Sequence, residues 1–209
     1  MFDNGQNDLH SGLKLMTEEQ LKESVSEIIN RLVQAVETLY QHGARAFWIH
    51  NTGPIGCLPY SIICYPPKPG NTDKNGCITS QNEVAQEFNR QLKDRVVSQL
   101  RQRLTNAIFT YVHIYSAKFT LISEAKKHGF SDRLGYRCGH YGEDYHLQCG
   151  KKGIVNGTEV FGAKCSNPSN YFSWDGIHYS HAANQWVANK ILDGSLSNTP
   201  ISITQACHF

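Results

Sequence analysis

Hydrophobic residues recur along two long stretches of the chain at the three- and four-residue spacing of an amphipathic helix. The first stretch follows Thr17 and Gln20, which together form a capping box, and it ends near Gly43, a typical C-terminal cap. The second begins at Ser80 and continues to Leu104. Both patterns predict long helices that bury one face. The apolar positions are Leu21, Val25, Ile28, Ile29, Leu32, Val36 and Leu39 in the first, and Val84, Phe88, Leu92, Val96, Leu100 and Leu104 in the second.

Short apolar segments alternate with these helices. Residues 44–51 and 107–115 are rich in β-branched and aromatic side chains, which predicts buried strands. Shorter helices are expected over residues 116–128 and 181–192. This alternation predicts an α/β protein with a parallel sheet, and we expect a single domain over residues 1–209.

Three other segments show no regular period. Residues 2–9 predict the end of a strand that runs into a loop. Residues 60–77 are rich in proline and glycine, so we expect an irregular excursion that a disulfide between Cys64 and Cys77 closes. Residues 129–172 are rich in glycine, tyrosine and cysteine, and we expect an ordered loop region held by disulfides.

Composition and charge narrow the possible function classes. The chain is 40% hydrophobic and 18% charged, as is ordinary for a globular protein. Its formal net charge of +2 gives no reason to expect nucleic acid or an anionic membrane as a partner. No apolar run reaches the ~18–20 residues that a membrane span needs. We therefore expect neither nucleic-acid binding nor stable membrane insertion.

Seven cysteines and a glycosylation sequon indicate the secretory pathway. The sequon Asn156-Gly157-Thr158 predicts a glycan on Asn156. The first residues have neither the positive nor the apolar region of a signal peptide. We expect a secreted protein whose beginning lies outside the printed sequence. The alternative is a cytosolic protein with scattered thiols and a chance sequon.

The strongest candidate for chemistry is the segment Ser-Trp-Asp-Gly-Ile-His at residues 173–178. It follows a loop and precedes the last predicted helix, where side chains are displayed rather than packed. Asp175 could orient the imidazole of His178, and that imidazole could take a proton from a nucleophile, as in a hydrolytic triad. The alternative interpretation is a turn aspartate followed by a histidine at a helix start.

Two further segments lie at the ends of predicted strands. The side-chain amide of Asn7 could donate a hydrogen bond to an anionic tetrahedral oxygen, an interaction worth roughly 2.7–4 kcal/mol of barrier lowering. The alternative there is an Asx turn. Residues 51–59 form a Gly/Pro loop at the end of a strand, where ligands gather in parallel sheets. Cys57 is its only titratable side chain, so we interpret this loop as a wall of the cleft.

Together these segments resemble one family, the plant GDSL esterase/lipases of the SGNH hydrolase superfamily, and especially its early-nodulin-like and fucosidase-named branch. The resemblance covers nearly the whole chain. It implies a three-layer α/β/α, flavodoxin-like parallel sheet and hydrolysis of small-molecule, lipid or polysaccharide esters through an acyl-serine, without a cofactor. By resemblance Asn7 is an oxyanion donor, Asp175 the triad acid and His178 the base. The matching motifs are Phe2-Asp3-x-Gly5-Gln6-Asn7-Asp8-Leu9, residues 51–59, residues 173–179 and Ala182-Ala183-Asn184.

The chain departs from the family pattern at the block that gives the family its name. No Gly-Asp-Ser-Leu segment with a nucleophilic serine is present, and the second block, whose glycine supplies another oxyanion donor, has no match either. Asp193-Gly194-Ser195-Leu196 has the letters in another order and follows His178, so we reject Ser195 as the nucleophile. We expect an N-terminally incomplete domain that lacks the first strands and has little or no esterase activity as printed.

A zinc site is a competing interpretation of the cysteine-rich region. Cys138 and His140, with His146 and Cys149, could supply a Cys₂His₂ set of ligands. A disulfide among Cys138, Cys149 and Cys165 is the favoured interpretation in a secreted protein.

A binding module without catalytic activity is a second alternative. Such a protein would keep the cleft without the nucleophile and would bind a ligand without turning it over. Aromatic side chains near the candidate site could contact a sugar or an acyl group. They are Tyr141, Tyr145, Tyr171 and Trp174.

Overall fold

The computed structural model describes residues 1–130, 132–164, 170–198 and 203–206. The chain forms two compact units. The first comprises Met1–Ile55, Glu83–Ala117 and Val187–Phe209, and the second comprises Gly56–Asn82 and Lys118–Trp186. None of the described helices combines the length and the apolar character that crossing a bilayer requires. The expected single domain stays a prediction.

The first unit contains a parallel sheet. Strands β1 (Phe2–Asp3), β2 (Ala46–His50) and β3 (Ile108–Val112) pair in that order, and every pairing is parallel. The rings of Phe47 and Phe109 lie opposite each other and stack with their centroids 5.0 Å apart. The two predicted strands and the α/β class are therefore confirmed.

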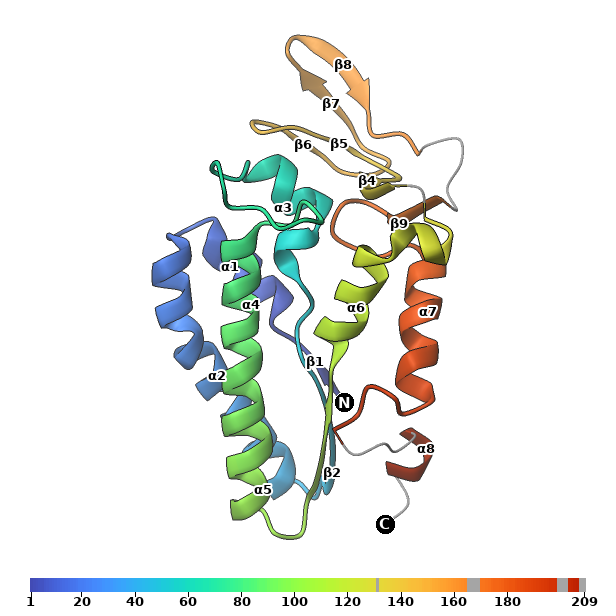
Figure 1. The fold of residues 1–209 in the computed structure, drawn as a ribbon. Coiled ribbons are helices and arrows are strands. Elements are labelled where there is room, and N and C mark those ends of the chain that lie inside the picture. The colour runs from blue at the N-terminus through green and yellow to red at the C-terminus, as the bar shows by residue number, and fades with distance from the viewer. Residues whose placement is uncertain (131, 165–169, 199–202, 207–209) are drawn as a thin grey trace. The chain divides into compact units, whose positions relative to one another are not determined.

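Long helices cover one side of this sheet, as Figure 1 shows. Helix α2 (Glu18–Gln41) begins at the predicted capping box, where Thr17 and Gln20 exchange hydrogen bonds. The second long helix is continuous through α4 (Thr79–Gln91), the π-helical segment η2 (Leu92–Gln99) and α5 (Leu100–Arg103). The apolar stripes of these helices meet Phe47, Ile49, Phe109 and Tyr111 of the sheet in one buried core.

Residues 2–9 contain the expected strand end as β1, but a helix takes the place of the expected loop. Helix α1 (Gln6–Leu13) begins directly after β1, so Asn7 lies in the first turn of a helix. Gly5 makes this abrupt change of direction possible because its φ is +110°, and a Cβ there would come within 2.6 Å of the Phe88 ring. The predicted loop was wrong because a helix of only eight residues leaves a weak periodic signal.

The remaining helices follow the sequence pattern closely. Helix α6 (Ile114–Ser123) continues into the 3₁₀ turn η3 (Ala125–His128), which ends at Gly129 with a φ of +85°. Helix α7 (His181–Leu192) has the predicted bounds. Helix α8 (Ile203–Ala206) lies in the C-terminal tail.

The second unit has more regular structure than its sequence suggests. The 3₁₀ turn η1 (Ile55–Cys57) leads to helix α3 (Pro59–Cys64), which begins on a proline because the first position of a helix needs no N–H donor. Residues 129–172 form strands of two to five residues, too short to show a period. They pair as β4 (Asp132–Tyr136) with β9 (Tyr171–Ser173), β5 (His140–Tyr141) with β6 (His146–Leu147), and β7 (Lys152–Val155) with β8 (Thr158–Phe161).

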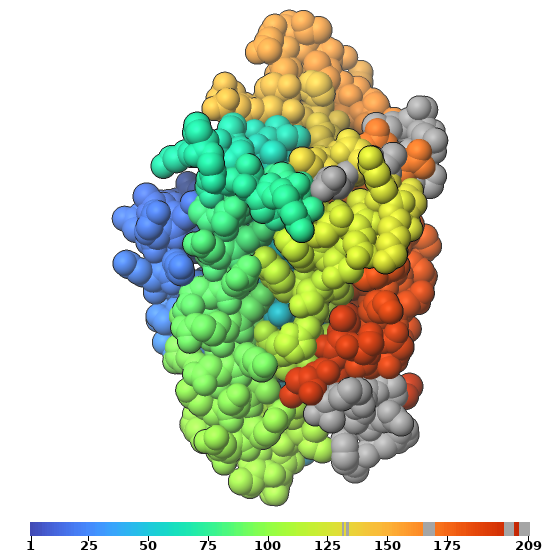
Figure 2. Space-filling model, in the orientation of Figure 1, coloured from blue at the N-terminus to red at the C-terminus, as the bar shows by residue number. Residues whose placement is uncertain are grey.

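The β7–β8 hairpin carries the glycosylation sequon at its tip. Asn156 and Gly157 form the turn and both have positive φ values, 49° and 78°, as a tight two-residue hairpin requires. Asn156 is exposed, and Figure 2 shows the hairpin, in orange, at the surface.

The disulfides correct one predicted pairing. Cys57 is bonded to Cys77, and Cys138 to Cys149, so the expected bond between Cys64 and Cys77 was wrong. Residues 56 and 78 run side by side: the N–H of Ile78 donates to the carbonyl oxygen of Gly56 at 2.8 Å. This contact brings Cys57, rather than Cys64, to Cys77. Cys165 lies outside the described residues.

Candidate active site

The candidate site is a closed loop between β9 and α7. The hydroxyl of Ser173 donates to the carbonyl oxygen of His178 at 3.2 Å and accepts from the N–H of Gly176 at 2.9 Å. The N–H of Trp174 donates to the same carbonyl oxygen at 2.7 Å. Ser173 is 1% exposed, so its hydroxyl holds the loop together and is closed to substrate.

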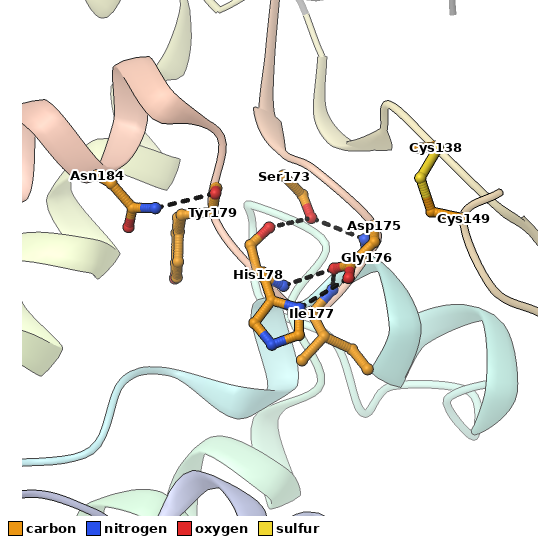
Figure 3. A network of polar contacts seen from close by, with 9 residues as sticks. All are labelled: Cys138, Cys149, Ser173, Asp175, Gly176, Ile177, His178, Tyr179 and Asn184. Carbon is orange, nitrogen blue, oxygen red and sulfur yellow. Dashed lines mark hydrogen bonds and ion pairs between the residues drawn. A yellow bond between two sulfur atoms is a disulfide. The ribbon is translucent and has the colours of Figure 1, made fainter. Parts of the chain in front are cut away.

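Asp175 and His178 face each other across this loop (Figure 3). One carboxylate oxygen of Asp175, Oδ1, accepts from the backbone N–H groups of Ile177 at 3.0 Å and His178 at 2.8 Å. The other, Oδ2, lies 2.7 Å from Nδ1 of the His178 ring. Because an ionised carboxylate only accepts, Nδ1 donates the proton, and Nε2 is left as the basic atom. The side chain of Asp175 is 19% exposed and that of His178 is 73% exposed, so the imidazole reaches solvent while the carboxylate is shielded.

A pocket of about 470 Å³ opens beside this pair. Burial raises the pKa of the Tyr141 phenol to about 12, and the nearby Asp175 carboxylate adds to this effect. Tyr141 is therefore neutral at physiological pH. The pocket is lined by Tyr141, His146, Leu147, Gln148, Cys149, Lys151, Asp175, Ile177 and His178.

Aromatic contacts support both the pocket and the loop. The N–H of Tyr60 donates to the carbonyl oxygen of Gly176 at 3.1 Å. The Tyr60 ring stacks on His146 with centroids 4.5 Å apart and meets Tyr141 edge-on at 6.4 Å. Burial also raises the pKa of Tyr60 above its ordinary value. Helix α3 thus contacts both the loop of residues 173–178 and the β5–β6 hairpin.

A family model described as GDSL-like Lipase/Acylhydrolase matches residues 1–191. The chain belongs to this family. Among curated plant proteins it is similar to the GDSL esterase/lipase At5g14450 of Arabidopsis thaliana, with 49% identity over 99% of the chain and 53% of that relative. It is also similar to the GDSL esterase/lipase ACHE of Zea mays, with 45% identity over 99% of the chain and 54% of the relative. The GDSL esterase/lipase ENOD8 of Medicago truncatula is 40% identical over 100% of the chain and 54% of the relative.

These findings confirm the predicted resemblance, and an Arabidopsis relative named Alpha-L-fucosidase 3, 44% identical over 92% of the chain, belongs to the same group of matches. The parallel sheet with its helices agrees with the α/β/α fold that the GDSL family implies. The chain spans about half the length of the curated relatives it matches.

Asn7 belongs to the first compact unit of this GDSL chain, whereas Asp175 and His178 belong to the second. Its side chain is exposed on the first turn of α1 and lines a pocket of about 380 Å³ with residues of α1 and α2. The role of Asn7 as an oxyanion donor stays a prediction.

The zinc alternative is wrong. Cys138 and Cys149 are joined by a disulfide, so neither offers the thiolate that zinc would need. Among the described residues, no group of three or more histidine, cysteine, aspartate or glutamate side chains is arranged to hold a metal ion. Cys57, the titratable side chain of the predicted cleft wall, is also in a disulfide.

Three of the four aromatic residues predicted to contact a ligand have different surroundings, and the fourth, Tyr171, begins strand β9. Tyr141 lines the pocket. The guanidinium of Arg137 lies over the Trp174 ring at 4.7 Å, and Tyr145 stacks on the ring of His140 at 5.3 Å. Sequence reasoning did not assign Gln148 or Lys151 to the pocket, because no local pattern marks two polar residues in a short irregular connection.

Proposed function

We propose that this chain supplies the acid and the histidine of a GDSL-type ester hydrolase. The observation that carries the proposal is the 2.7 Å contact from Nδ1 of His178 to Oδ2 of Asp175, at the edge of a pocket large enough for a small ester. Asp175 holds the ring so that Nε2 can take a proton from a serine hydroxyl and then give it to the departing alcohol. The carboxylate also stabilises the imidazolium that forms between these steps.

The proposed enzyme takes its nucleophilic serine from outside the printed sequence, because the Gly-Asp-Ser-Leu block has no match in it. Asn7 is assigned to the oxyanion hole, and no cofactor takes part. We further propose that the protein is secreted and that Asn156 carries a glycan, which the exposed hairpin tip would accommodate.

A second candidate function is ligand binding without turnover. The observation that favours it is the presence of a formed pocket in a chain without the serine block. The two candidates differ in one measurable respect: only the hydrolase gives serine-dependent turnover once the missing block is supplied.

A chimeric protein tests the proposal. The portion of the Zea mays relative that this chain does not match is joined to the 209-residue chain, and hydrolysis of a short p-nitrophenyl ester is compared with that by the intact relative. We expect activity in the chimera, its loss on His178→Ala, and little or none in the 209-residue chain alone. A folded chimera without activity, beside an active relative, would refute the hydrolase and favour the binding module.

Two substitutions serve as controls in the same chimera. His181 is an exposed histidine three residues beyond His178. The substitution His181→Ala should leave the rate within about twofold, because His181 takes no part in the proposed mechanism. Ser195→Ala should also leave the rate unchanged, since its hydroxyl donates to the carbonyl oxygen of Lys190 at the end of α7.

A further inference from the structure

We infer that the pocket beside His178 binds the alcohol part of the ester and that this part carries a negative charge, as in an ester formed at the hydroxyl of a hydroxycarboxylic acid. This inference rests on the proposed function, because it uses the direction of proton transfer in ester hydrolysis. It adds the substrate class, which neither the fold nor the family relationship specifies.

The geometry of the acid–histidine pair indicates which part of the ester, the acyl or the alcohol part, lies in the pocket. Nδ1 of His178 is engaged by Asp175, so Nε2 is the atom that gives its proton to the departing alcohol. The alcohol oxygen must therefore come within hydrogen-bonding distance of His178. Since His178 itself lines the 470 Å³ pocket, the group attached to that oxygen lies in the pocket.

The charges in the pocket favour an anion on that group. Lys151 lines the pocket, and its ammonium group forms no ion pair with any residue that the structure describes. Asp175 is the one acidic residue among those lining the pocket, and both of its oxygens already accept hydrogen bonds within the loop. The charge of Lys151 is thus available to a ligand.

The backbone of Lys151 is held in place although its side chain reaches solvent. Its N–H donates to the carbonyl oxygen of Gln148 at 3.1 Å, and its own carbonyl oxygen accepts from the N–H of Gly162 at 2.9 Å. The next residue, Lys152, differs from Lys151 in ion pairing and in position. Its ammonium group pairs with Glu159 at 3.2 Å across the β7–β8 hairpin, and it does not line the pocket. The two neighbouring lysines therefore form a matched pair for experiment.

The rest of the lining suits the carbon skeleton of a hydroxy acid. Leu147 and Ile177 offer apolar surface, and Tyr141 and His146 offer aromatic rings that pack against Tyr60. Apolar and aromatic surface beside one lysine suits a ligand that is apolar in part and charged at one end. A neutral lipid alcohol would gain no charge interaction with the ammonium group of Lys151.

Two probes that differ in one charge test the inference: O-acetylmandelate, which carries a carboxylate on its alcohol part, and its neutral methyl ester. Binding to the 209-residue chain is measured by calorimetry, and NMR signals of the His178 ring report occupancy of the site. We expect the charged probe to bind about fivefold more tightly, which corresponds to about 1 kcal/mol and is typical of an exposed ion pair. Added salt should reduce this preference.

Substitutions assign the preference to one side chain. Lys151→Ala should abolish it, Lys151→Arg should retain it, and Lys152→Ala should leave it unchanged. Equal affinity for the two probes in the unaltered chain, no binding of either at millimolar concentration, or a preference that survives Lys151→Ala would each overturn the inference.

The binding measurement separates this inference from the proposed function because it needs no turnover. An inactive chimera combined with a charge preference that depends on Lys151 would reject the hydrolase and retain an anion-binding pocket. An active chimera combined with equal affinity for both probes would retain the hydrolase and reject the charged alcohol.

Discussion

Replacing Asp175 by asparagine should reverse the tautomer of the His178 ring, the proposed catalytic base, with little change in the loop. The asparagine oxygen can still accept from the N–H groups of Ile177 and His178, at 3.0 and 2.8 Å in the present loop. Its amide nitrogen, however, replaces the oxygen that lies 2.7 Å from Nδ1 of His178. An amide nitrogen only donates, so Nδ1 must become the acceptor and the ring proton moves to Nε2. The atom that should take the serine proton is then already protonated.

The hydrogen bonds of Asp175 set the size of two separate effects. The rate should fall about 10⁴-fold, or about 5.4 kcal/mol of barrier, as when the tautomer of a triad histidine is reversed. The free energy of unfolding should fall by only about 1 kcal/mol or less, because a charged hydrogen bond is exchanged for a neutral one to a ring that is 73% exposed. Asp175→Ala should cost about 2 kcal/mol, since it also removes the acceptor of two backbone N–H groups.

Three measurements check this reasoning. Nitrogen chemical shifts of the His178 ring report the tautomer in the 209-residue chain, urea denaturation gives the free energy of unfolding, and kcat/KM is measured in the chimera with the Zea mays segment. If the Asp175→Asn protein kept its proton on Nδ1, or if the chimera lost less than tenfold in rate, Asp175 would not orient the base. Equal losses of stability in the asparagine and alanine variants would show that the backbone hydrogen bonds contribute little.

Three further predictions concern stability, each measured by chemical denaturation. Removing the disulfide with Cys57→Ala and Cys77→Ala should lower the free energy of unfolding by about 3 kcal/mol, since the bonded residues are 20 apart; Cys64→Ala should cost less than about 1 kcal/mol, and a larger loss for Cys64 would contradict the observed pairing. Burial is the main reason that the pKa of His10 falls from 6.5 to about 4, so the unfolded chain binds the proton more readily. The contribution of neutral His10 to the free energy of unfolding is complete above pH 6.5, and about 3 kcal/mol of it is lost as the pH falls to about 4. Over the same pH range, the free energy of unfolding of the His10→Gln protein should fall by about 3 kcal/mol less. Thr17→Ala removes the acceptor of the capping box and should cost about 1 kcal/mol, and an unchanged denaturation midpoint would show that the cap contributes nothing.

The long periodic elements could be predicted because their signals are local. The capping box at Thr17 fixes the start of α2, and the spacing of apolar residues fixes the buried faces of both long helices. The bounds of α7 follow in the same way. The Asp-x-x-His segment was also found in the sequence, because a loop of this length brings its first and last side chains together with little help from the rest of the fold.

The pocket and the disulfide partners depended on contacts between residues far apart in the chain. Cys57 meets Cys77 because residues 56 and 78 run side by side, a proximity that neither residue's neighbours in the sequence reveal. The short strands around the pocket, β5 and β6, have two residues each and show no period. Their pairing places His146 in the pocket beside Asp175 and His178, and the connection beyond them adds Lys151 to the same pocket.

The sequence by itself therefore determined the long helices, the two buried strands, the acid–histidine pair and the family, since each depends on patterns of residue types along the chain. The tertiary structure alone decided which cysteines are bonded and which charged side chains line the pocket. Those features arise when segments far apart in the chain pack against one another. The local sequence of one segment does not specify which distant segment it contacts.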